Sequence, residues 1–364
     1  MTAIRLTLRG VRCRAVEVPM TYVLGTSAGA VRAAPLLLVD VDTEEGVTGR
    51  TYLFCYTRAA AGPIKTMLDD AASALAGAPL DPAAWWATLN KRYTLIGVQG
   101  IVRMAMAALD TACWDALAIA AKVPLATLIG GAPKAIPAYN SCGLGLMAPV
   151  ALGDEAEKLL AGGFKAMKLR LGYPTLKEDL AALGAVRASI GEHVKIMVDY
   201  NQALSVEEAL ARGRALDEHS VYWLEEPVRH DDYAGNARLA QVLTTPIQIG
   251  ENFSLPYAMH AALDRGACDY VMPDLERIGG VTGWRQAAAI ANTRRIPMSS
   301  HLFPEVSAHL LAATPTAHWL EYVDWANAIV EEPLEIADGY AVVQQRPGNG
   351  LVWNEDALRH YELR

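Results

Sequence analysis

Charged residues recur at the ends of short apolar runs in the second half of the chain, and this repeat restricts the fold more than any other feature. The runs between residues 166 and 323 are AMKLRL, IMVDYN, YWLEEP, IQIGEN, DYVMPD, PMSSHL and HWLEYV. From the second run onward their polar ends are Asp199, Glu225, Glu251, Asp274, His301 and Glu321, at intervals of 26, 26, 23, 27 and 20 residues. One strand, one helix and two short loops occupy roughly 20–30 residues. The repeat therefore predicts a β/α barrel, in which the carboxyl ends of all strands meet at one face.

The remaining sequence indicates a second domain, because 364 residues are more than a bare barrel needs. Residues 4–42 alternate as strands do, and residues 65–128 follow a helical pattern. Residues 101–121 are apolar on nearly every side, which predicts a buried helix at the domain junction. Two segments, 21–34 and 50–63, are expected to be mobile lid loops that contribute side chains to the barrel mouth.

Composition excludes several classes of protein. A net charge of −8 argues against a nucleic-acid partner. Five scattered cysteines without a CxxC pair are typical of reduced thiols in a cytoplasmic protein. The N-terminus lacks the apolar centre of a signal peptide, and no stretch approaches eighteen uninterrupted apolar residues, so no membrane partner is expected.

Three of the polar strand ends are carboxylates on successive strands. Asp199, Glu225 and Glu251 would repel one another in one pocket without a cation, and an all-oxygen set favours Mg²⁺ over Zn²⁺. A single such residue could be a solvated loop acid, but three at a constant interval predict a metal site. In the motif LEEP, Glu225 and Glu226 face opposite ways, so only one of them can point into the barrel mouth.

Asp274 and His301 end the next two strands, where the carboxylate can orient the imidazole of a general base. Lys168 and Arg170 lie two apart on one strand and point the same way, so together they can neutralise a carboxylate substrate. Glu321 would be driven toward its neutral form beside a bound carboxylate and could then donate a hydrogen bond. Together these groups suit removal of a proton from the carbon next to a carboxylate, which gives an enediolate.

The same residues resemble the mandelate racemase subgroup of the enolase superfamily over nearly the whole chain. The matching motifs are YLFCYT, ALDTACWDAL, IMVDYNQ, EEP, GEN, IGGVTGW, PMSSHLF and SAHLLAATPTAHWLE. The resemblance implies an N-terminal α+β capping domain (1–130, completed by about 335–364) on a modified (β/α)7β TIM-like barrel (131–334). It also implies Mg²⁺ on the three carboxylates and a homo-oligomer, since octamers are common in the subgroup.

The resemblance further implies roles for individual residues. It makes the Asp274–His301 dyad the base and Glu321 the electrophilic acid. It adds Ser141, Asn201 and Tyr56 to the substrate site, with Tyr56 in the lid.

One departure from the family pattern concerns the reaction. The subgroup's racemases carry Lys-x-Lys, in which the second lysine is the base opposite the histidine, but this chain has Lys168-Leu-Arg170. A guanidinium stays protonated to about pH 12 or beyond and is a poor base. Two-base racemisation is therefore disfavoured, and one-face chemistry by His301 remains.

We therefore expect a Mg²⁺-dependent lyase that dehydrates a hydroxy or sugar acid to a 2-keto-3-deoxy acid. A mandelate-type racemase or epimerase is the alternative, because the segment VLGTSAGAV is small and apolar and suits an aryl substrate. An inactive carboxylate-binding protein is less favoured, because a binder would not need His301, Asp274 and Glu321 together. A barrel hydrolase would need a cluster of histidine ligands, which the sequence does not offer.

Overall fold

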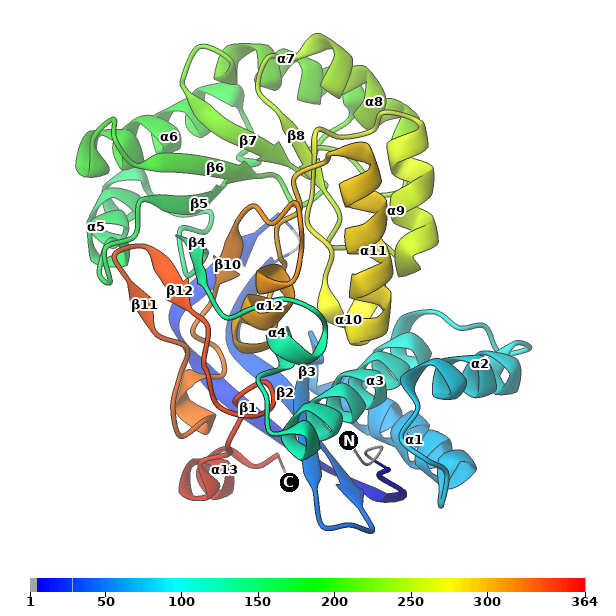
Figure 1. Ribbon diagram of the computed structural model, residues 1–364. Coiled ribbons are helices and arrows are strands. Elements are labelled where there is room, and N and C mark those ends of the chain that lie inside the picture. Colours follow the sequence, from blue (N-terminus) through cyan, green and yellow to red (C-terminus); the bar gives the residue numbers. More distant parts are fainter. Residues whose placement is uncertain (1–4, 28, 364) are drawn as a thin grey trace.

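The computed structural model describes residues 5–27 and 29–363, and it consists of an N-terminal cap and a barrel (Figure 1). The cap contains an antiparallel sheet in the order β1-β2-β3, followed by helices. Its elements are β1 (Leu8–Thr26), β2 (Gly29–Thr43), β3 (Thr48–Phe54), α1 (Arg58–Leu75), α2 (Pro82–Tyr93) and α3 (Gly100–Ala121). A short helix, α4 (Leu125–Leu128), leads from the cap into the barrel.

The barrel alternates strands and helices. Its strands are β4 (Ala135–Asn140), β5 (Ala166–Arg170), β6 (Lys195–Asp199), β7 (Val221–Glu225), β8 (Ile247–Ile249), β9 (Tyr270–Val271) and β10 (Leu320–Tyr322). Its helices are α5 (Pro149–Leu159), α6 (Leu176–Ile190), α7 (Val206–Leu216), α8 (Tyr233–Val242), α9 (Leu255–Asp264), α10 (Leu275–Ile278), α11 (Gly280–Arg294) and α12 (Pro304–Ala312). Neighbouring strands from β4 to β9 pair in parallel, and β10 closes the ring by pairing in parallel with β4. The prediction of a (β/α)7β barrel with an α+β cap is confirmed.

The segment PMSSHL completes the barrel without forming a regular strand. Met298 makes single bridges to Val271 on one side and to Ala317 on the other. A further bridge joins His301 to Asp274. The segment therefore occupies a strand position, as its apolar run predicted, and its pairing still brings His301 beside Asp274.

Helix α3 is the central element of the cap and contacts β3, α1, α10 and α11. Most of its apolar side chains are buried, as the sequence pattern predicted for residues 101–121. Among the described residues it is the one helix long and apolar enough to cross a membrane by length and composition, and 72% of its most apolar stretch is buried inside the protein. It is thus a core helix that joins the two domains.

The loop conformation predicted for 21–34 is wrong, because most of this segment continues the β1–β2 hairpin, but Leu24 and Val31 do contribute side chains to the cavity at the barrel mouth. Leu24 pairs with Val31, and Thr26 pairs with Gly29. The Gly25 carbonyl also accepts a hydrogen bond from the Leu146 amide at 3.1 Å, which anchors the hairpin on the loop after β4. In Figure 1 this blue hairpin extends from the cap toward the barrel.

The second predicted lid loop, 50–63, is also wrong for most of its length. Residues up to Phe54 belong to β3, which is paired with β2, and α1 begins at Arg58. The side chain of Thr57 accepts a hydrogen bond at the start of α1 and so begins the helix. Only 55–57 remain as a connection, and Tyr56 there adopts φ 60°.

The C-terminal segment serves both domains, whereas the sequence predicted that about 335–364 completes the cap. Strands β11 (Ile336–Ala337) and β12 (Tyr340–Val342) instead form a hairpin that extends barrel strand β4. It follows a short 3₁₀ helix, η1 (Asn327–Ile329). The part from Asn349 through α13 (Glu355–Tyr361) returns to the cap, where Trp353 donates to Asp40 of β2 and Glu362 bridges to Val16 of β1.

Candidate active site

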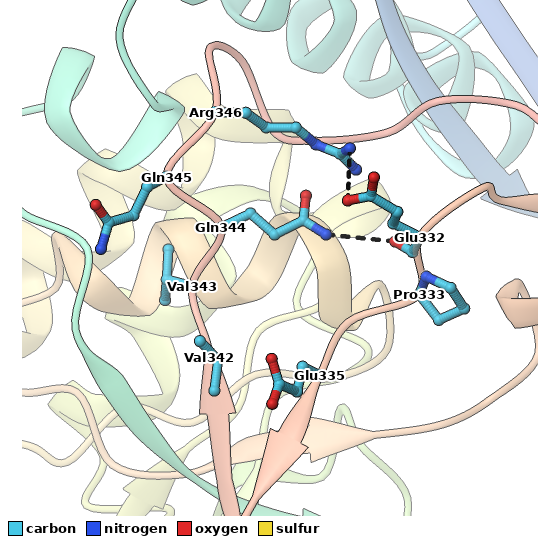
Figure 2. A pocket seen from close by; sticks show the side chains of 8 residues that line it. All are labelled: Glu332, Pro333, Glu335, Val342, Val343, Gln344, Gln345 and Arg346. Carbon is cyan, nitrogen blue, oxygen red and sulfur yellow. Dashed lines mark hydrogen bonds and ion pairs between the residues drawn. The ribbon is translucent and has the colours of Figure 1, made fainter.

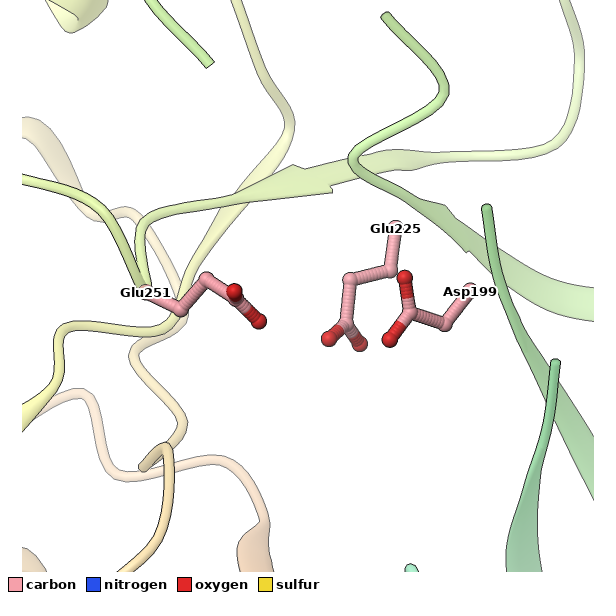
Figure 3. A group of neighbouring side chains, drawn as sticks. All are labelled: Asp199, Glu225 and Glu251. Atoms are coloured by element: carbon pink, nitrogen blue, oxygen red, sulfur yellow. The ribbon is translucent and has the colours of Figure 1, made fainter. Parts of the chain in front are cut away.

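Three carboxylates converge at the carboxyl ends of neighbouring barrel strands (Figure 3). Asp199 ends β6, Glu225 ends β7, and Glu251 lies two residues beyond β8. One oxygen from each lies within 4.8 Å of the others. Asp199 and Glu225 are 1% and 0% exposed, so their mutual repulsion is poorly screened by water. A buried, all-oxygen set of this kind fits Mg²⁺.

Glu226 is not a member of this cluster. Both of its carboxylate oxygens accept hydrogen bonds from Asn252 Nδ2, at 2.9 and 3.0 Å. Burial and the nearby Glu251 hold the pKa of Glu226 well above its usual range. Glu225 is thus the acid of the LEEP pair that faces the barrel mouth.

Lys168 neutralises part of the carboxylate cluster. Its Nζ lies 2.7 Å from Glu225, 2.8 Å from Glu321 and 3.3 Å from Asp199. Burial alone would lower the pKa of Lys168, but these three carboxylates raise it above the usual lysine range. The lysine is therefore a fixed cation that bridges the acid cluster and Glu321.

His301 and Asp274 form a hydrogen-bonded pair. Nδ1 of His301 lies 2.7 Å from Asp274 Oδ2, and Asp274 Oδ1 accepts the backbone amides of Glu276 and Arg277 at the start of α10. Nε2 of His301 faces Glu251 Oε2 at 3.2 Å. Burial lowers the pKa of His301, but the surrounding carboxylates outweigh it and raise the pKa to about 10. Asp274 thus fixes Nδ1 of the ring, and Nε2 faces the carboxylate cluster.

Glu321 is held by a backbone amide and by a lysine. It accepts a hydrogen bond from the Leu302 amide at 2.8 Å, besides its ion pair with Lys168. Burial raises the pKa of Glu321, but Lys168 and His301 outweigh it and hold the pKa below the usual range. Glu321 is therefore ionised here, whereas the neutral form was predicted for a protein that holds a carboxylate substrate.

Arg170 is engaged by the loop that follows β4. Its Nη1 donates to the carbonyls of Ser141 and Gly143 at 2.9 and 2.7 Å, and its Nη2 donates to Ser141 Oγ at 2.8 Å. Ser141 is fully buried and does not line the cavity described next, so its hydroxyl meets Arg170 in place of the predicted substrate oxygen. Arg170 itself reaches the cavity wall.

A cavity of about 310 Å³ lies above the carboxylate cluster. Its charged floor includes Lys168, Arg170, Asp199, Glu251, His301 and Glu321. Its apolar wall consists of Leu24, Val31, Phe54, Leu302 and Trp325. The predicted residues Tyr56 and Asn201 also line it, and Asn201 Nδ2 donates to Asp199 Oδ2 at 3.0 Å. Asp274 and Glu225 are 0% exposed and do not line the cavity.

The polar residues of the cavity that sequence reasoning missed include Gln202, Asn252 and Arg277. Asn252 directly follows a predicted metal ligand, and Arg277 lies three residues after Asp274, so a turn of helix brings it back to the same face. Their position next to strand ends could have assigned them to the cavity.

A second hollow of about 390 Å³ lies along the C-terminal segment (Figure 2). Its lining residues are Glu332, Pro333, Glu335, Val342, Val343, Gln344, Gln345 and Arg346. Arg346 forms an ion pair with Glu332 at 3.0 Å across it. None of the predicted site residues lines this hollow, so the chemistry belongs to the cavity at the barrel mouth.

Comparison with known proteins agrees with this architecture. Residues 8–130 match the family described as mandelate racemase/muconate lactonizing enzyme, N-terminal domain, and residues 151–357 match the family described as enolase C-terminal domain-like. A 3,6-anhydro-α-L-galactonate cycloisomerase of Streptomyces coelicolor is 33% identical over 358 residues, which are 96% of this chain and 97% of the relative. An L-talarate/galactarate dehydratase of Salmonella typhimurium is 34% identical over 273 residues, 74% of this chain and 68% of the relative.

A solved structure is similar over the whole chain. The enolase from Bradyrhizobium complexed with magnesium and mandelic acid is 40% identical, covers 100% of both chains and has a TM-score of 0.94. The similar proteins thus include dehydratases and cycloisomerases, and structures that contain magnesium.

Proposed function

This chain belongs to the mandelate racemase/muconate lactonizing enzyme family of the enolase superfamily, and we propose that His301 removes the α-proton of a 2-hydroxy carboxylate in its cavity. The chain is a Mg²⁺-dependent enzyme of the lyase or isomerase class. The observation that carries the proposal is the pairing of His301 with Asp274 next to the carboxylate cluster, where the imidazole and the cluster share one cavity.

Asp199, Glu225 and Glu251 would hold the Mg²⁺. Their oxygens lie close enough to share one ion, and their burial makes the bare cluster costly without positive charge. When bound, the ion would act as a Lewis acid that stabilises the negative charge formed when the α-proton leaves. Asn201 supports the site because its amide nitrogen is bonded to Asp199.

The proton transfer belongs to His301 and Asp274. Asp274 accepts the Nδ1 hydrogen. Burial lowers the pKa of His301 but the bare carboxylates raise it, and a cation held by Glu251 would offset their charge, so the ring would be neutral and its Nε2 could take the α-proton. As the C2–H bond breaks, its electron pair enters the enediolate. In the foremost version of the reaction, Nε2 then returns the proton to the hydroxyl on C3, and the C3–O bond breaks with loss of water. The resulting enol tautomerises to a 2-keto-3-deoxy acid.

Lys168 and Glu321 would stabilise the substrate carboxylate as its charge rises. Lys168 is a fixed cation between Glu321 and the cluster. A substrate carboxylate next to Glu321 would compete for Lys168 and repel the ionised acid, which favours protonation of Glu321. The protonated acid could then donate a hydrogen bond to the enediolate.

Arg170 supports reaction at one face only. Its Nη1 and Nη2 donate to Ser141 and Gly143, which holds the guanidinium against the loop after β4. A guanidinium is also a poor base. The face opposite His301 therefore lacks the second base that racemisation by two bases needs, and this favours elimination.

Racemisation of an aryl 2-hydroxy acid is the second candidate. Five apolar side chains wall the cavity, and the similar Bradyrhizobium protein was crystallised with mandelic acid. An aryl acid without a β-hydroxyl cannot lose water. Racemisation would require Arg170 to act as an unusual base.

Proton NMR in D₂O tests the proposal. The Mg²⁺-loaded protein is incubated with sugar acids, other 2-hydroxy acids and both mandelate enantiomers, and 2-keto acids are assayed in parallel. A keto product establishes elimination, whereas deuterium at C2 with inversion establishes racemisation. Failure of every acid to exchange at C2 would contradict the proposal. His301→Asn should abolish exchange, and a protein that only binds carboxylates would keep its affinity in that variant.

A further inference from the structure

Two cavity-lining side chains carry hydrogen-bond donors that the fold leaves unused. Arg277, on α10, donates from Nη1 to Asn252 Oδ1 and, at 3.3 Å, to the Glu251 carbonyl. Its Nε and Nη2 have no hydrogen-bond acceptor within 5–27 and 29–363, and neither is an enclosed atom. Gln202, after β6, accepts the His230 amide on Oε1 at 3.0 Å, and its Nε2 likewise meets no acceptor in these ranges. Both residues line the cavity.

The guanidinium of Arg277 is held in place before any ligand binds. Its central carbon lies 4.7 Å from the centroid of the Tyr56 ring, so this cap residue covers one face. The Nη1 contacts hold one edge on the β8 side. The other edge therefore stays available at little cost in side-chain entropy, because the side chain is already ordered.

The charge of Arg277 is compensated within the protein. Asp274, Glu251 and Glu276 all lie near enough to act on this guanidinium. The free edge of the guanidinium requires hydrogen-bond acceptors. Neutral hydroxyl oxygens meet this requirement without adding a negative charge to a cavity that already holds several carboxylates.

The apolar part of the cavity lining offers a single side-chain donor. Leu24, Val31, Phe54, Leu302 and Trp325 line that part of the cavity. Of these, only the Trp325 indole carries a polar hydrogen. A substrate with several hydroxyl groups would supply acceptors to the Arg277 and Gln202 donors, whereas a plain alkyl or aryl acid would leave these donors without a partner.

We propose that Arg277 and Gln202 are specificity-determining residues that bind hydroxyl oxygens on the substrate carbons beyond C3. This inference rests on the proposed function, because it assumes that the carboxylate end of the substrate lies over the acid cluster. It assigns the selection of polyhydroxy acids over aryl and alkyl acids to these two side chains.

The test compares six-carbon acids that share the carboxylate and the C2 hydroxyl and differ in the hydroxyl groups on C3 to C6. Exchange of the C2 proton in D₂O is measured for the epimers D-gluconate and D-mannonate, and for both enantiomers of 2-hydroxyhexanoate. Arg277→Met should lower kcat/KM for the reactive aldonate about ten- to hundredfold, since bonds from a charged donor are lost. The same variant should keep kcat/KM for 2-hydroxyhexanoate within about twofold of the wild-type value, because this acid has no distal hydroxyl group that could bond to Arg277. Gln202→Glu keeps the acceptor for the His230 amide, removes the donor, and should shift selectivity in the same direction.

Arg285→Met is the matched control. Arg285 also lies over an aromatic ring, with its guanidinium carbon 5.2 Å from the Trp114 centroid, but it does not line the cavity. The Arg285→Met variant should have the wild-type kcat/KM for both kinds of acid. The Mn²⁺ affinity of Arg277→Met shows whether the substitution has moved Glu251, whose carbonyl accepts a bond from Arg277. If Glu251 has moved, the result for Gln202→Glu decides the inference, because Gln202 makes no bond to Glu251.

Three results would overturn the inference and leave α-proton removal standing. They are an equal loss of kcat/KM on both kinds of acid, no loss of kcat/KM on the aldonate, and a wild-type preference for 2-hydroxyhexanoate. Calorimetric titration of D-gluconate into Mg²⁺-loaded His301→Asn, with and without Arg277→Met, gives a second readout that needs no turnover. If no acid exchanges at C2, the proposed function fails, and this titration still decides the role of Arg277. Weaker gluconate binding in the double variant supports that role, and unchanged binding contradicts it.

Discussion

At the scale of single residues, Trp223 is predicted to increase the metal affinity of the site by orienting Glu225. Glu225 Oε1 is bonded to Lys168, and Oε2 accepts the Trp223 indole N–H at 3.2 Å inside the barrel. An outer hydrogen bond of this kind fixes the orientation of a ligand. Trp223→Phe retains the ring and removes the donor, so Mn²⁺ affinity should fall about tenfold. Titration followed by electron paramagnetic resonance of free Mn²⁺ measures it.

Trp319→Phe provides the control for this prediction. Its indole donates to Tyr222 Oη at 3.3 Å and contacts no carboxylate of the cluster. It should bind Mn²⁺ as the wild type does. An unchanged affinity in Trp223→Phe, or an equal loss in both variants, would show that the indole N–H does not position Glu225.

Arg170 is the residue whose exchange should alter the reaction. A lysine near other cations can lose its proton near neutral pH, which an arginine cannot. Arg170→Lys should therefore increase the rate at which C2 of mandelate is inverted, by at least about tenfold over the wild type, because a base becomes available on the second face. Circular dichroism of each enantiomer follows the inversion. No gain would mean that the loop at Ser141 and Gly143 also has to change.

The site shows what residue-level reasoning can and cannot supply. Spacing alone placed Asp199, Glu225 and Glu251 on neighbouring strand ends, and the structure brings them together. The partners of Arg170 could not be predicted, because they are backbone carbonyls of an irregular loop, whose path no periodic pattern specifies. The chemistry of a strand end is thus easier to predict than the loop that surrounds it.

At the scale of elements, His309 connects helix α12 to helix α4. It is 1% exposed, and its Nδ1 accepts the Ala126 amide at 3.3 Å. Burial lowers the pKa of His309 to about 4. An unfolded histidine has a pKa of about 6.5, so between these values the unfolded chain binds the proton and stability falls as pH falls.

His309→Asn should make unfolding less dependent on pH. Between pH 7 and 5, the wild type should lose roughly 1–2 kcal/mol more of its free energy of unfolding than the variant. Urea denaturation at both pH values, with EDTA present, measures the difference. Parallel pH dependence in the two proteins would show that His309 also titrates normally when folded.

Most elements follow from periodicity, and the errors have a common cause. Barrel strands and α3 carry long, one-sided apolar patterns, and they appear where the patterns predict them. The segment 21–34 was assigned to a loop because it is rich in glycine and small residues, yet pairing of β1 with β2 and the bond to the Leu146 amide extend the hairpin. Strand pairing at long range can therefore override weak local propensity.

At the scale of the whole molecule, buried carboxyl groups tie the cap to the barrel. Asp110 of α3 accepts the Thr282 amide of α11 at 2.8 Å, and Glu305 of α12 accepts the Tyr52 hydroxyl of β3 at 2.7 Å. Burial raises the pKa of Asp110 to about 7. Because such buried bonds are costly to break without replacement, we expect the two domains to unfold together.

Metal removal tests this coupling. The candidate ligands come from β6, β7 and the end of β8, so Mg²⁺ would connect three barrel strands and bind only the folded chain. At about 100 times its Kd, a ligand of this kind adds about 2.7 kcal/mol to the free energy of unfolding. Calorimetry should therefore show one transition whose Tm rises with Mg²⁺ and falls with EDTA. Glu251→Gln should reduce the rise, whereas Asp231→Asn, an exposed acid paired with Arg229, should keep it. Two transitions, of which only one moves with Mg²⁺, would show that the cap unfolds independently and that the Asp110 and Glu305 contacts do not couple it to the metal site.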